Sequence, residues 1–486
     1  MTPAPTTTQQ ITLLEALLPL ITLAALLIAC ATFLELNGEL LVLVILASAA
    51  VAGWIAKVHG ATWDDIQRVT GERFASVLPV ILILLAIGML IGSWVMSGTI
   101  PFIVFWGIRI VRPEWLALTA FLATATMSLC TGTSWGSAGT IGVALMGMAT
   151  ALHAPLPMLA GAVVSGAYFG DKMSPLSDST NICAIGAGVP LYRSIRHLLY
   201  TAIPSFTACV IVYSLASRLS PVSGDGLPAS ARILLGELDG TFRLSWITLI
   251  PLAVVLWGIL RKYPPALAIT LSAAVAVIVA IALQGVTPID ALTSAVAGAR
   301  VDMIHAWVAG ATPSKGYVTL VQRGGLYSMA PTLVVIIAAF MLAAAMDLSG
   351  ALRLLIDRML AAVTSVFRLI AATMAAGATM IALTSHGGVT ALVIGGLFQP
   401  AYKERLLAPE NLSRSLDDSV TITEPLMPWT VSAIFMATTL GVPTAQYAPW
   451  AVFCYGGPIF SLTIAALYRF TGFGIKRLNP EEEIVK

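Results

Sequence analysis

The sequence predicts an all-α, polytopic membrane protein, and three observations support this fold class. Of the 486 residues, 58% are hydrophobic and only 10% are charged, whereas soluble domains carry about 25% charged residues. Mean hydropathy is +0.90. The apolar residues form long runs, near or above the roughly 20 residues that a helix needs to cross a bilayer, and they lack the short alternating pattern of a membrane barrel. The lipid bilayer is therefore an expected partner.

Ten of these runs are expected to be membrane spans. They lie at about 12–34, 40–57, 74–97, 155–190, 197–217, 244–260, 264–285, 327–347, 412–440 and 448–471. The polar segment 1–10 lacks the basic start of a cleavable signal peptide, so the first run is expected to be a retained span. A multi-pass protein results.

Other classes of protein find little support in the composition. The net charge is +2 and the basic residues form no dense cluster, so nucleic acid is not an expected partner. The five cysteines are scattered without metal-ligand spacing, which predicts neither a disulfide framework nor a metal site beyond sodium. The sequence contains no nucleophile elbow or phosphate-binding loop. We therefore expect no enzyme activity and no cofactor.

Two further apolar stretches, 113–151 and 366–402, are interrupted near the middle by small polar residues. Two half-spans meeting at such a tip describe a re-entrant hairpin, whose irregular backbone is tolerated at membrane depth only inside protein or beside water. A short basic amphipathic segment precedes each stretch, at 99–112 and 350–364, and is expected to lie along the interface. The expected tip residues, which would contact the substrate, are Thr131, Gly132, Thr133, Ser134, Thr384, Ser385, His386 and Gly387.

Short strings recur along the chain in the same order at an offset of 250 to 253 residues; one pair is Ser97-Gly98 and Ser349-Gly350. This shared offset predicts a first repeat at 1–218, a connecting segment at 219–243 and a second repeat at 244–486. A repeat of about five spans must insert its second copy upside down. Inverted repeats are common in secondary transporters, which bind substrate between the copies.

The densest polar string within an apolar run is Gly170–Asn181, inside the span at 155–190. Pro175 should break the helix there, because proline lacks the backbone N–H and clashes with the preceding turn. Asp171 and Asp178 flank the break. Neutral oxygens come from Ser174, Ser177, Thr180 and Asn181. Carboxylate and hydroxyl oxygens suit a hard cation such as sodium, and a carboxylate also lets a proton compete with it.

The second repeat offers a similar broken helix at about 412–440, with a polar string from Asp417 to Trp429. Aligning Pro425 with Pro175 places Glu424 opposite Ser174. The expected ion-binding residues of this string are Asp418, Thr421, Thr423 and Glu424.

Several residues admit structural interpretations beside the functional ones. Asp417 and Asp418 either bind ions or lie at the mouth of the span, where charged side chains reach the interface. Lys172 is expected to be an ion-pair partner of Asp171 or Asp178. His386 is either a structural donor or a gating or proton-relay group, and the tip hydroxyls either bind ions or satisfy free backbone groups.

Three strings carry a family resemblance: Gly132–Ser137, Ser165–Asp178 and Asp418–Trp429. They resemble the NhaC-type sodium/proton antiporter family, within the ion-transporter superfamily, and the agreement in length and span order covers nearly the whole chain. The resemblance implies cation-coupled transport across a bacterial cytoplasmic membrane, an elevator motion and a homodimer. Its members include sodium/proton antiporters, a malate/lactate exchanger and amino-acid carriers similar to sodium/methionine symporters.

Two functions follow as hypotheses. In the first, Asp171 and Asp178 exchange sodium for protons by alternating access, with Asp178 the more important because polar neighbours surround it. In the alternative, sodium drives transport of a small carboxylate such as malate or lactate, or of an amino acid such as methionine. A carboxylate needs helix N-termini or a basic partner, and Lys172 is the only strong basic candidate in the core.

Overall fold

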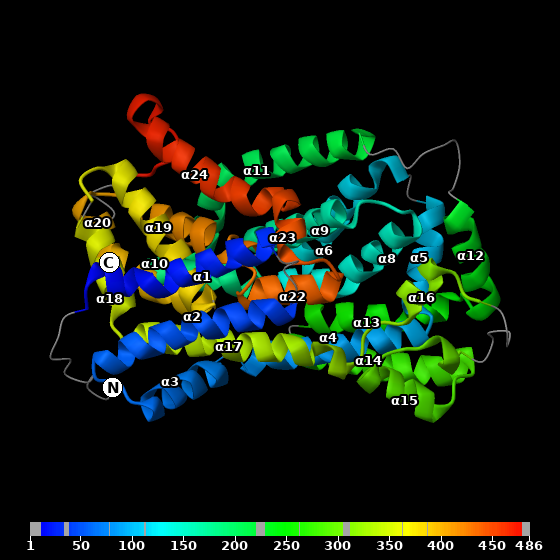
Figure 1. Cartoon of the computed structure of the whole chain (residues 1–486). Helices are drawn as coiled ribbons and strands as arrows, with labels where there is room; N and C mark the ends of the chain where they lie inside the picture. Colours follow the sequence, from blue (N-terminus) through cyan, green and yellow to red (C-terminus); the bar gives the residue numbers. More distant parts are fainter. Residues whose placement is uncertain are drawn as a thin grey trace.

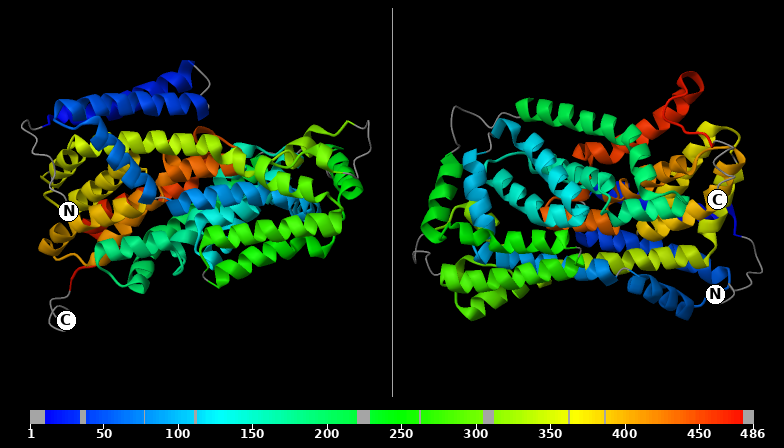
Figure 2. Two further views of the ribbon diagram at one scale, coloured as in Figure 1. Left: turned by 90° about the horizontal axis from the view of Figure 1, so that it is seen from below. Right: turned by 180° about the vertical axis from the view of Figure 1, so that it is seen from behind.

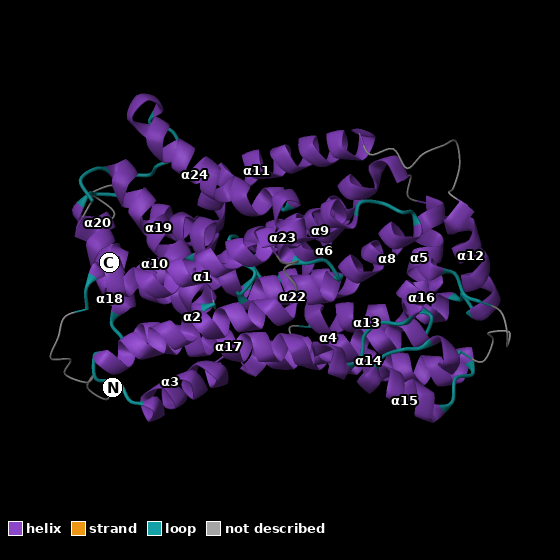
Figure 3. Cartoon of the chain, viewed as in Figure 1, coloured by secondary structure: helices purple, strands orange, loops and turns teal. Residues whose placement is uncertain are grey.

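The computed structural model describes residues 11–33, 38–76, 78–110, 113–219, 229–261, 263–304, 312–361, 363–385 and 387–478. Within these ranges the regular secondary structure is helical, with loops and turns between the helices (Figure 3), apart from one isolated bridge between Leu407 and Arg477. The all-α fold predicted from the long apolar runs is confirmed.

Most of the expected spans are long apolar helices that run along the same direction in Figure 1. In the described residues, six helices are long and apolar enough to cross a membrane, or up to nine spans if each bent helix pair counts as one. The six spans lie in α1 (Leu13–Phe33), α2 (Gly38–Val58), α11 (Leu191–Leu219), α14 (Pro265–Val279), α17 (Ala330–Leu348) and α19 (Val366–Thr384). The three bent pairs include α4 (Leu78–Met96), α13 (Ile250–Leu260) and α24 (Val452–Thr471).

Shorter helices connect these spans. They are α3 (Trp63–Ser76), α5 (Thr99–Ile110), α12 (Ala229–Thr241), α15 (Pro288–Ala297), α16 (Lys315–Val321), α18 (Ala351–Ala361) and α23 (Thr444–Tyr447). The chain bends by 69° between α4 and α5. In Figure 1, α5 and α18 lie across opposite ends of the long helices, where the sequence predicts interfacial segments.

Each predicted hairpin is a helix–turn–helix. The first comprises α6 (Leu116–Thr131), α7 (Ser134–Ser137), a π-helical turn and α8 (Val143–Ala151). The second comprises α19 (Val366–Thr384) and α20 (Gly387–Glu404). The first hairpin extends toward the end that carries α5, and the second toward the end that carries α18 (Figures 1 and 2).

Both predicted broken helices are present. In the first, α9 (Leu156–Met173) ends before Pro175 and α10 (Asp178–Ala187) begins after it. In the second, α21 (Pro409–Leu416) continues into a π-helical turn, Asp417–Thr421, and α22 (Val431–Leu440) follows a short irregular segment. These two breaks and the two hairpin tips position the site described below.

Local backbone structure recurs between the halves at a nearly constant offset. Gly132 and Ser385, 253 residues apart, both end a hairpin helix in the left-handed conformation, with φ of 69° and 57°. The Thr131–Ser137 hydroxyl pair beside the first tip has a counterpart in the Thr384–Thr390 pair beside the second, also 253 residues on. These turns and hydroxyl pairs thus recur at the same offset as the short sequence strings.

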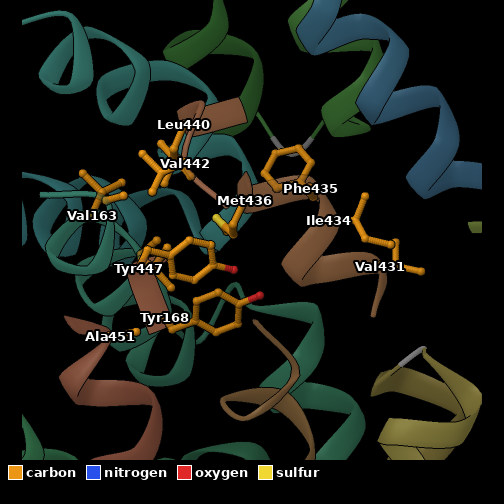
Figure 4. Close-up of a cluster of buried hydrophobic side chains, with 14 of the residues drawn as sticks. Val163, Tyr168, Val431, Ile434, Phe435, Met436, Leu440, Val442, Tyr447 and Ala451 are labelled. Atoms are coloured by element: carbon orange, nitrogen blue, oxygen red, sulfur yellow. The ribbon is translucent and has the colours of Figure 1, made fainter. Parts of the chain in front are cut away.

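Close helix packing couples the halves of the chain. Glycine lets α10 and α20 approach, because a Cβ at Gly186 would lie 2.7 Å from the carbonyl oxygen of Ala391, and one at Gly395 would lie 2.3 Å from that of Gly186. The buried apolar cluster in Figure 4 joins α9 and α22, with Tyr168 beside Tyr447. The first broken helix thus packs against elements of the second half.

Candidate ion-binding cavity

A cavity of about 970 Å³ lies where both hairpin tips and both broken helices meet. Its lining includes three acidic residues, Asp171, Asp178 and Glu424. Other lining residues from the tips and breaks are Thr131, Gly132, Thr133, Ser134, Ser179, Asn181, Gly387, Thr421 and Ser432. Elements that were predicted separately from each half of the sequence therefore converge on a single space.

Asp171 lies in the last turn of α9 and is 9% exposed. The Ser134 hydroxyl, from the first hairpin tip, donates a hydrogen bond of 2.9 Å to its Oδ2. The Ser179 hydroxyl donates a longer one of 3.4 Å to the same oxygen. A buried carboxylate held by neutral donors keeps lone pairs for a cation or a proton, so Asp171 has the properties expected of an ion-binding group.

Asp178 has a different environment. It is the first residue of α10 and it is exposed on the cavity wall. A carboxylate at a helix N-terminus is stabilised by the free backbone N–H groups and by the helix dipole. Its charge therefore needs no bound cation, in contrast to that of Asp171.

The neutral oxygens of the first break mostly satisfy backbone groups. The Ser177 hydroxyl accepts from the Thr180 N–H at 3.3 Å, and the Thr180 hydroxyl donates to the Lys172 carbonyl at 3.1 Å. The Asn181 amide donates to the Ser177 carbonyl at 2.7 Å, and the Ser174 hydroxyl accepts from the Leu176 N–H. Of these four predicted ligands, only Asn181 lines the cavity.

Glu424 contributes the buried carboxylate of the second break and is 8% exposed. It faces the backbone N–H of Gly387, at the start of α20, and the hydroxyl and N–H of Ser432, in the first turn of α22. The approach to the second tip is close, because a Cβ at Gly387 would lie 2.9 Å from Glu424 Oε2. Sequence reasoning missed Ser432, which no polar string singled out.

The other predicted residues of the second break have mainly local partners. The Thr421 hydroxyl lines the cavity and donates to the Asp417 carbonyl at 2.9 Å. The Thr423 hydroxyl donates to the Ser419 carbonyl at 2.6 Å and is absent from the described cavity lining. Thr421 is thus the better placed of the two to contact an ion.

Helix caps give a register between the two breaks that differs from the proline alignment. Ser177 caps α10 and Thr430 caps α22, again 253 residues apart. The same offset aligns Asp171 with Glu424, and Ser134 with Gly387. In each half the tip residue contacts the buried carboxylate, Ser134 with Asp171 and Gly387 with Glu424. The caps therefore identify Asp171 as the counterpart of Glu424, whereas the proline alignment placed Ser174 opposite Glu424.

Lys172 corrects another expectation. Its ammonium group pairs with Asp418 Oδ1 at 2.5 Å and Asp417 Oδ1 at 3.1 Å, where the sequence suggested Asp171 or Asp178 as its partner. All three side chains are at most 1% exposed. Asp417 and Asp418 therefore lie neither at an exposed mouth nor on the described cavity lining. Lys172, Asp417 and Asp418 are called the sealed cluster below.

The tips themselves dock against the breaks. A Cβ at Gly132 would lie 2.6 to 2.9 Å from atoms of Leu176, in the first break. At the second tip, the Ser385 carbonyl accepts from the Val431 N–H at 3.4 Å. The Thr133 hydroxyl caps α7, and Thr131 and Thr384 pair with hydroxyls of their own hairpins. His386 lies outside the described residues.

Comparison with known proteins assigns this sequence to a family. Residues 166–473 match the family described as the Na+/H+ antiporter family. The chain is 34% identical to the Na+/H+ antiporter NhaC of Alkalihalophilus pseudofirmus, over 93% of this chain and 94% of that protein. The chain belongs to the Na+/H+ antiporter family. It is a multi-pass membrane protein, as the apolar helices also indicate.

The chain is similar to two further curated proteins. An uncharacterised Na+/H+ antiporter of Haemophilus influenzae is 42% identical over 97% of this chain and 98% of its own length. A malate-2H+/Na+-lactate antiporter of Bacillus subtilis is 28% identical over 95% of each chain. The resemblance to NhaC-type antiporters seen in three sequence strings is confirmed over nearly the whole chain.

Proposed function

We propose that this protein exchanges sodium for protons across the bacterial cytoplasmic membrane. The observation that carries the proposal is the convergence of two buried carboxylates, Asp171 and Glu424, and two hairpin tips on one cavity. Carboxylate and hydroxyl oxygens are suitable ligands for a hard cation. The similarity to two Na+/H+ antiporters over more than nine-tenths of the chain supports the same function.

The exchange itself follows from the chemistry of a shared site. An ionised Asp171 or Glu424 binds sodium, whereas a protonated one cannot balance the charge of the cation, so the two ions exclude each other. Ser134 stabilises the ionised form of Asp171 by donating a hydrogen bond to it. Sodium binding on one side of the membrane therefore releases a proton, and protonation on the other side releases sodium.

Alternating access is supported by the arrangement of the halves. The two hairpins extend toward opposite ends of the long helices (Figures 1 and 2), as expected of inverted repeats. The proposal includes the two repeats predicted from the sequence, a homodimer and an elevator-like movement of the tips and breaks. Transport of ions, without chemical conversion of a substrate, is the proposed activity.

The cavity volume supports a second candidate function. About 970 Å³ is at the upper end of the roughly 300–1,000 Å³ typical of small-molecule sites, and far exceeds the needs of a dehydrated sodium ion. Together with the similarity to a malate-2H+/Na+-lactate antiporter, this volume keeps sodium-coupled transport of a small organic solute as the alternative.

Sodium uptake into proteoliposomes against an imposed pH gradient separates the candidates. We expect uptake without any organic solute, and we expect purified wild-type protein in detergent to release protons when sodium is added. The double variant Asp171→Asn, Glu424→Gln should fold and release none. Uptake that requires an organic solute would favour the alternative, and wild-type proton release from the double variant would place the exchange site elsewhere.

A further inference from the structure

Building on the proposed sodium/proton exchange, we propose that the cavity also binds small organic cations of the guanidinium type in competition with sodium, and that it rejects carboxylates. This assigns a ligand class to the part of the cavity that sodium does not fill. The argument uses the charge of the lining, the state of the nearby helix N-termini and the volume.

Charge is the first step. Every charged side chain in the described cavity lining is acidic: Asp171, Asp178 and Glu424. Lys172 follows Asp171 in the chain, yet its ammonium group is paired with Asp417 and Asp418 in the sealed cluster, away from the cavity. Because opposite charges attract strongly where water is partly excluded, this lining favours a cation. His386 and Lys262 lie outside the described residues.

The helix N-termini at the cavity are the second step. A carboxylate solute without a basic partner needs the free N–H groups of a helix start. At the start of α10 the Ser177 hydroxyl accepts from the Thr180 N–H, and the Asp178 side chain adds a negative charge on the cavity wall. Glu424 faces the N–H groups of Gly387 and Ser432 at the starts of α20 and α22. The Ser177 hydroxyl and the Glu424 carboxylate thus already accept from N–H groups that a malate or lactate carboxylate would need, and the negative charge of Asp178 repels such a solute.

Volume and shape form the third step. The cavity holds about 970 Å³, and its lining combines the acidic residues with apolar groups such as Ile83, Ile182 and Val431. Trp135 also lines it, held by stacking on Phe435 at 4.5 Å between ring centres. An aromatic wall beside carboxylates suits a flat cation with a short alkyl group, which gains both ionic and cation–π contacts.

The test uses methylguanidinium, which stays charged at all working pH values, and methylurea, a neutral molecule of nearly the same shape. Proton release from purified wild-type protein is measured on addition of each compound, of sodium and of lactate. We expect methylguanidinium to release protons and to raise the sodium concentration for half-maximal release at least tenfold. Methylurea and lactate should do neither.

Variants connect this effect to the cavity. Glu424→Gln and, separately, Asp171→Asn should weaken the response to methylguanidinium at least tenfold, with folding checked by gel filtration. Asp302→Asn is the matched control, since Asp302 is an exposed carboxylate paired with Arg300 outside the described lining. A response that survives in both cavity variants would overturn the assignment.

The outcomes separate this inference from the proposed function. Proton release by sodium but not by methylguanidinium, or competition by lactate, would overturn the ligand class and leave sodium/proton exchange intact. Release by methylguanidinium but not by sodium would overturn the exchange function and support the organic-cation site. Release by neither would overturn both.

Discussion

Two adjacent residues at the end of α9, Asp171 and Lys172, belong to two different acidic regions. Asp171 faces a cavity, where Ser134 donates to it from a hairpin tip. Lys172 is instead paired with Asp417 and Asp418 in the sealed cluster. The cavity carboxylates have neutral hydrogen-bond donors as partners and lie beside a large space, whereas those of the sealed cluster share a buried ammonium partner. We therefore propose that the same residue type serves ion exchange in one region and structure in the other.

The two regions also differ in their relation to the repeat. Asp171 and Glu424 are aligned at the offset of 253, but Asp417 and Asp418 align with Val164 and Ser165, which are not acidic. Each half thus contributes one of the two cavity carboxylates. The sealed cluster, in contrast, occurs once, and Lys172 is separated from Asp417 and Asp418 by 245 and 246 residues. We infer that the sealed cluster holds the two broken helices together.

The largest effect should come from breaking the sealed cluster. Lys172→Met leaves Asp417 and Asp418 buried without their ammonium partner, and loss of one partner of a buried ion pair costs about 3–5 kcal/mol. We expect a strong loss of thermal stability in detergent, measured by fluorescence-detected gel filtration. Adding Asp418→Asn to this variant should restore much of the loss. Equal stability of wild type and Lys172→Met would show that the cluster does not hold the fold.

The second effect concerns the contact between a tip and a break. Gly132→Ala places a Cβ within 2.6 to 2.9 Å of Leu176, including backbone atoms that cannot move aside locally. We expect sodium/proton exchange in proteoliposomes to fall at least tenfold while the protein remains folded, because the break must shift.

Gly285→Ala is the matched control for this variant. Gly285 has a similar positive φ, 71° against 69° for Gly132, but a Cβ there meets nothing within 4 Å. Both substitutions carry the strain of the left-handed backbone, about 1–2 kcal/mol. Equal exchange rates in the two variants would mean that strain, and not the contact with the break, determines the outcome.

The sequence predicts a feature of these two regions well when the residues that form it lie close together along the chain. Local signals worked: the apolar runs gave the spans, and Pro175 gave the break between α9 and α10. The pairing of Lys172 was wrong, because its partners lie more than 240 residues away and sequence spacing says nothing about such contacts. The register of the second break was also misjudged, because the helix caps Ser177 and Thr430 mark equivalent positions better than the prolines do.

A third, smaller effect tests the support of Asp171. Ser134→Ala removes the hydrogen bond of 2.9 Å to Oδ2. A hydrogen bond to a charged group contributes about 1.5–3 kcal/mol, and a neutral one about 0.5–1.5 kcal/mol. Since the bond stabilises the ionised form that binds sodium, we expect the sodium concentration for half-maximal proton release to rise about three- to tenfold. Ser461→Ala, in α24 outside the described cavity lining, should leave it unchanged.

The smallest effect should come from Asp178, which the sequence ranked above Asp171. Its carboxylate is exposed and stands at the start of α10, where the helix dipole stabilises the charge without a cation. Such a group attracts cations to the cavity but does not hold them tightly, and salt screens attraction of this kind over about 10 Å at 0.1 M ionic strength. We expect Asp178→Asn to slow sodium uptake about two- to threefold at low ionic strength, with little effect at high ionic strength. Asp171→Asn should stay inactive under both conditions. Complete loss of exchange in Asp178→Asn at every ionic strength would instead make Asp178 a direct ion ligand, and the distinction between its exposed carboxylate and the buried pair Asp171 and Glu424 would fail.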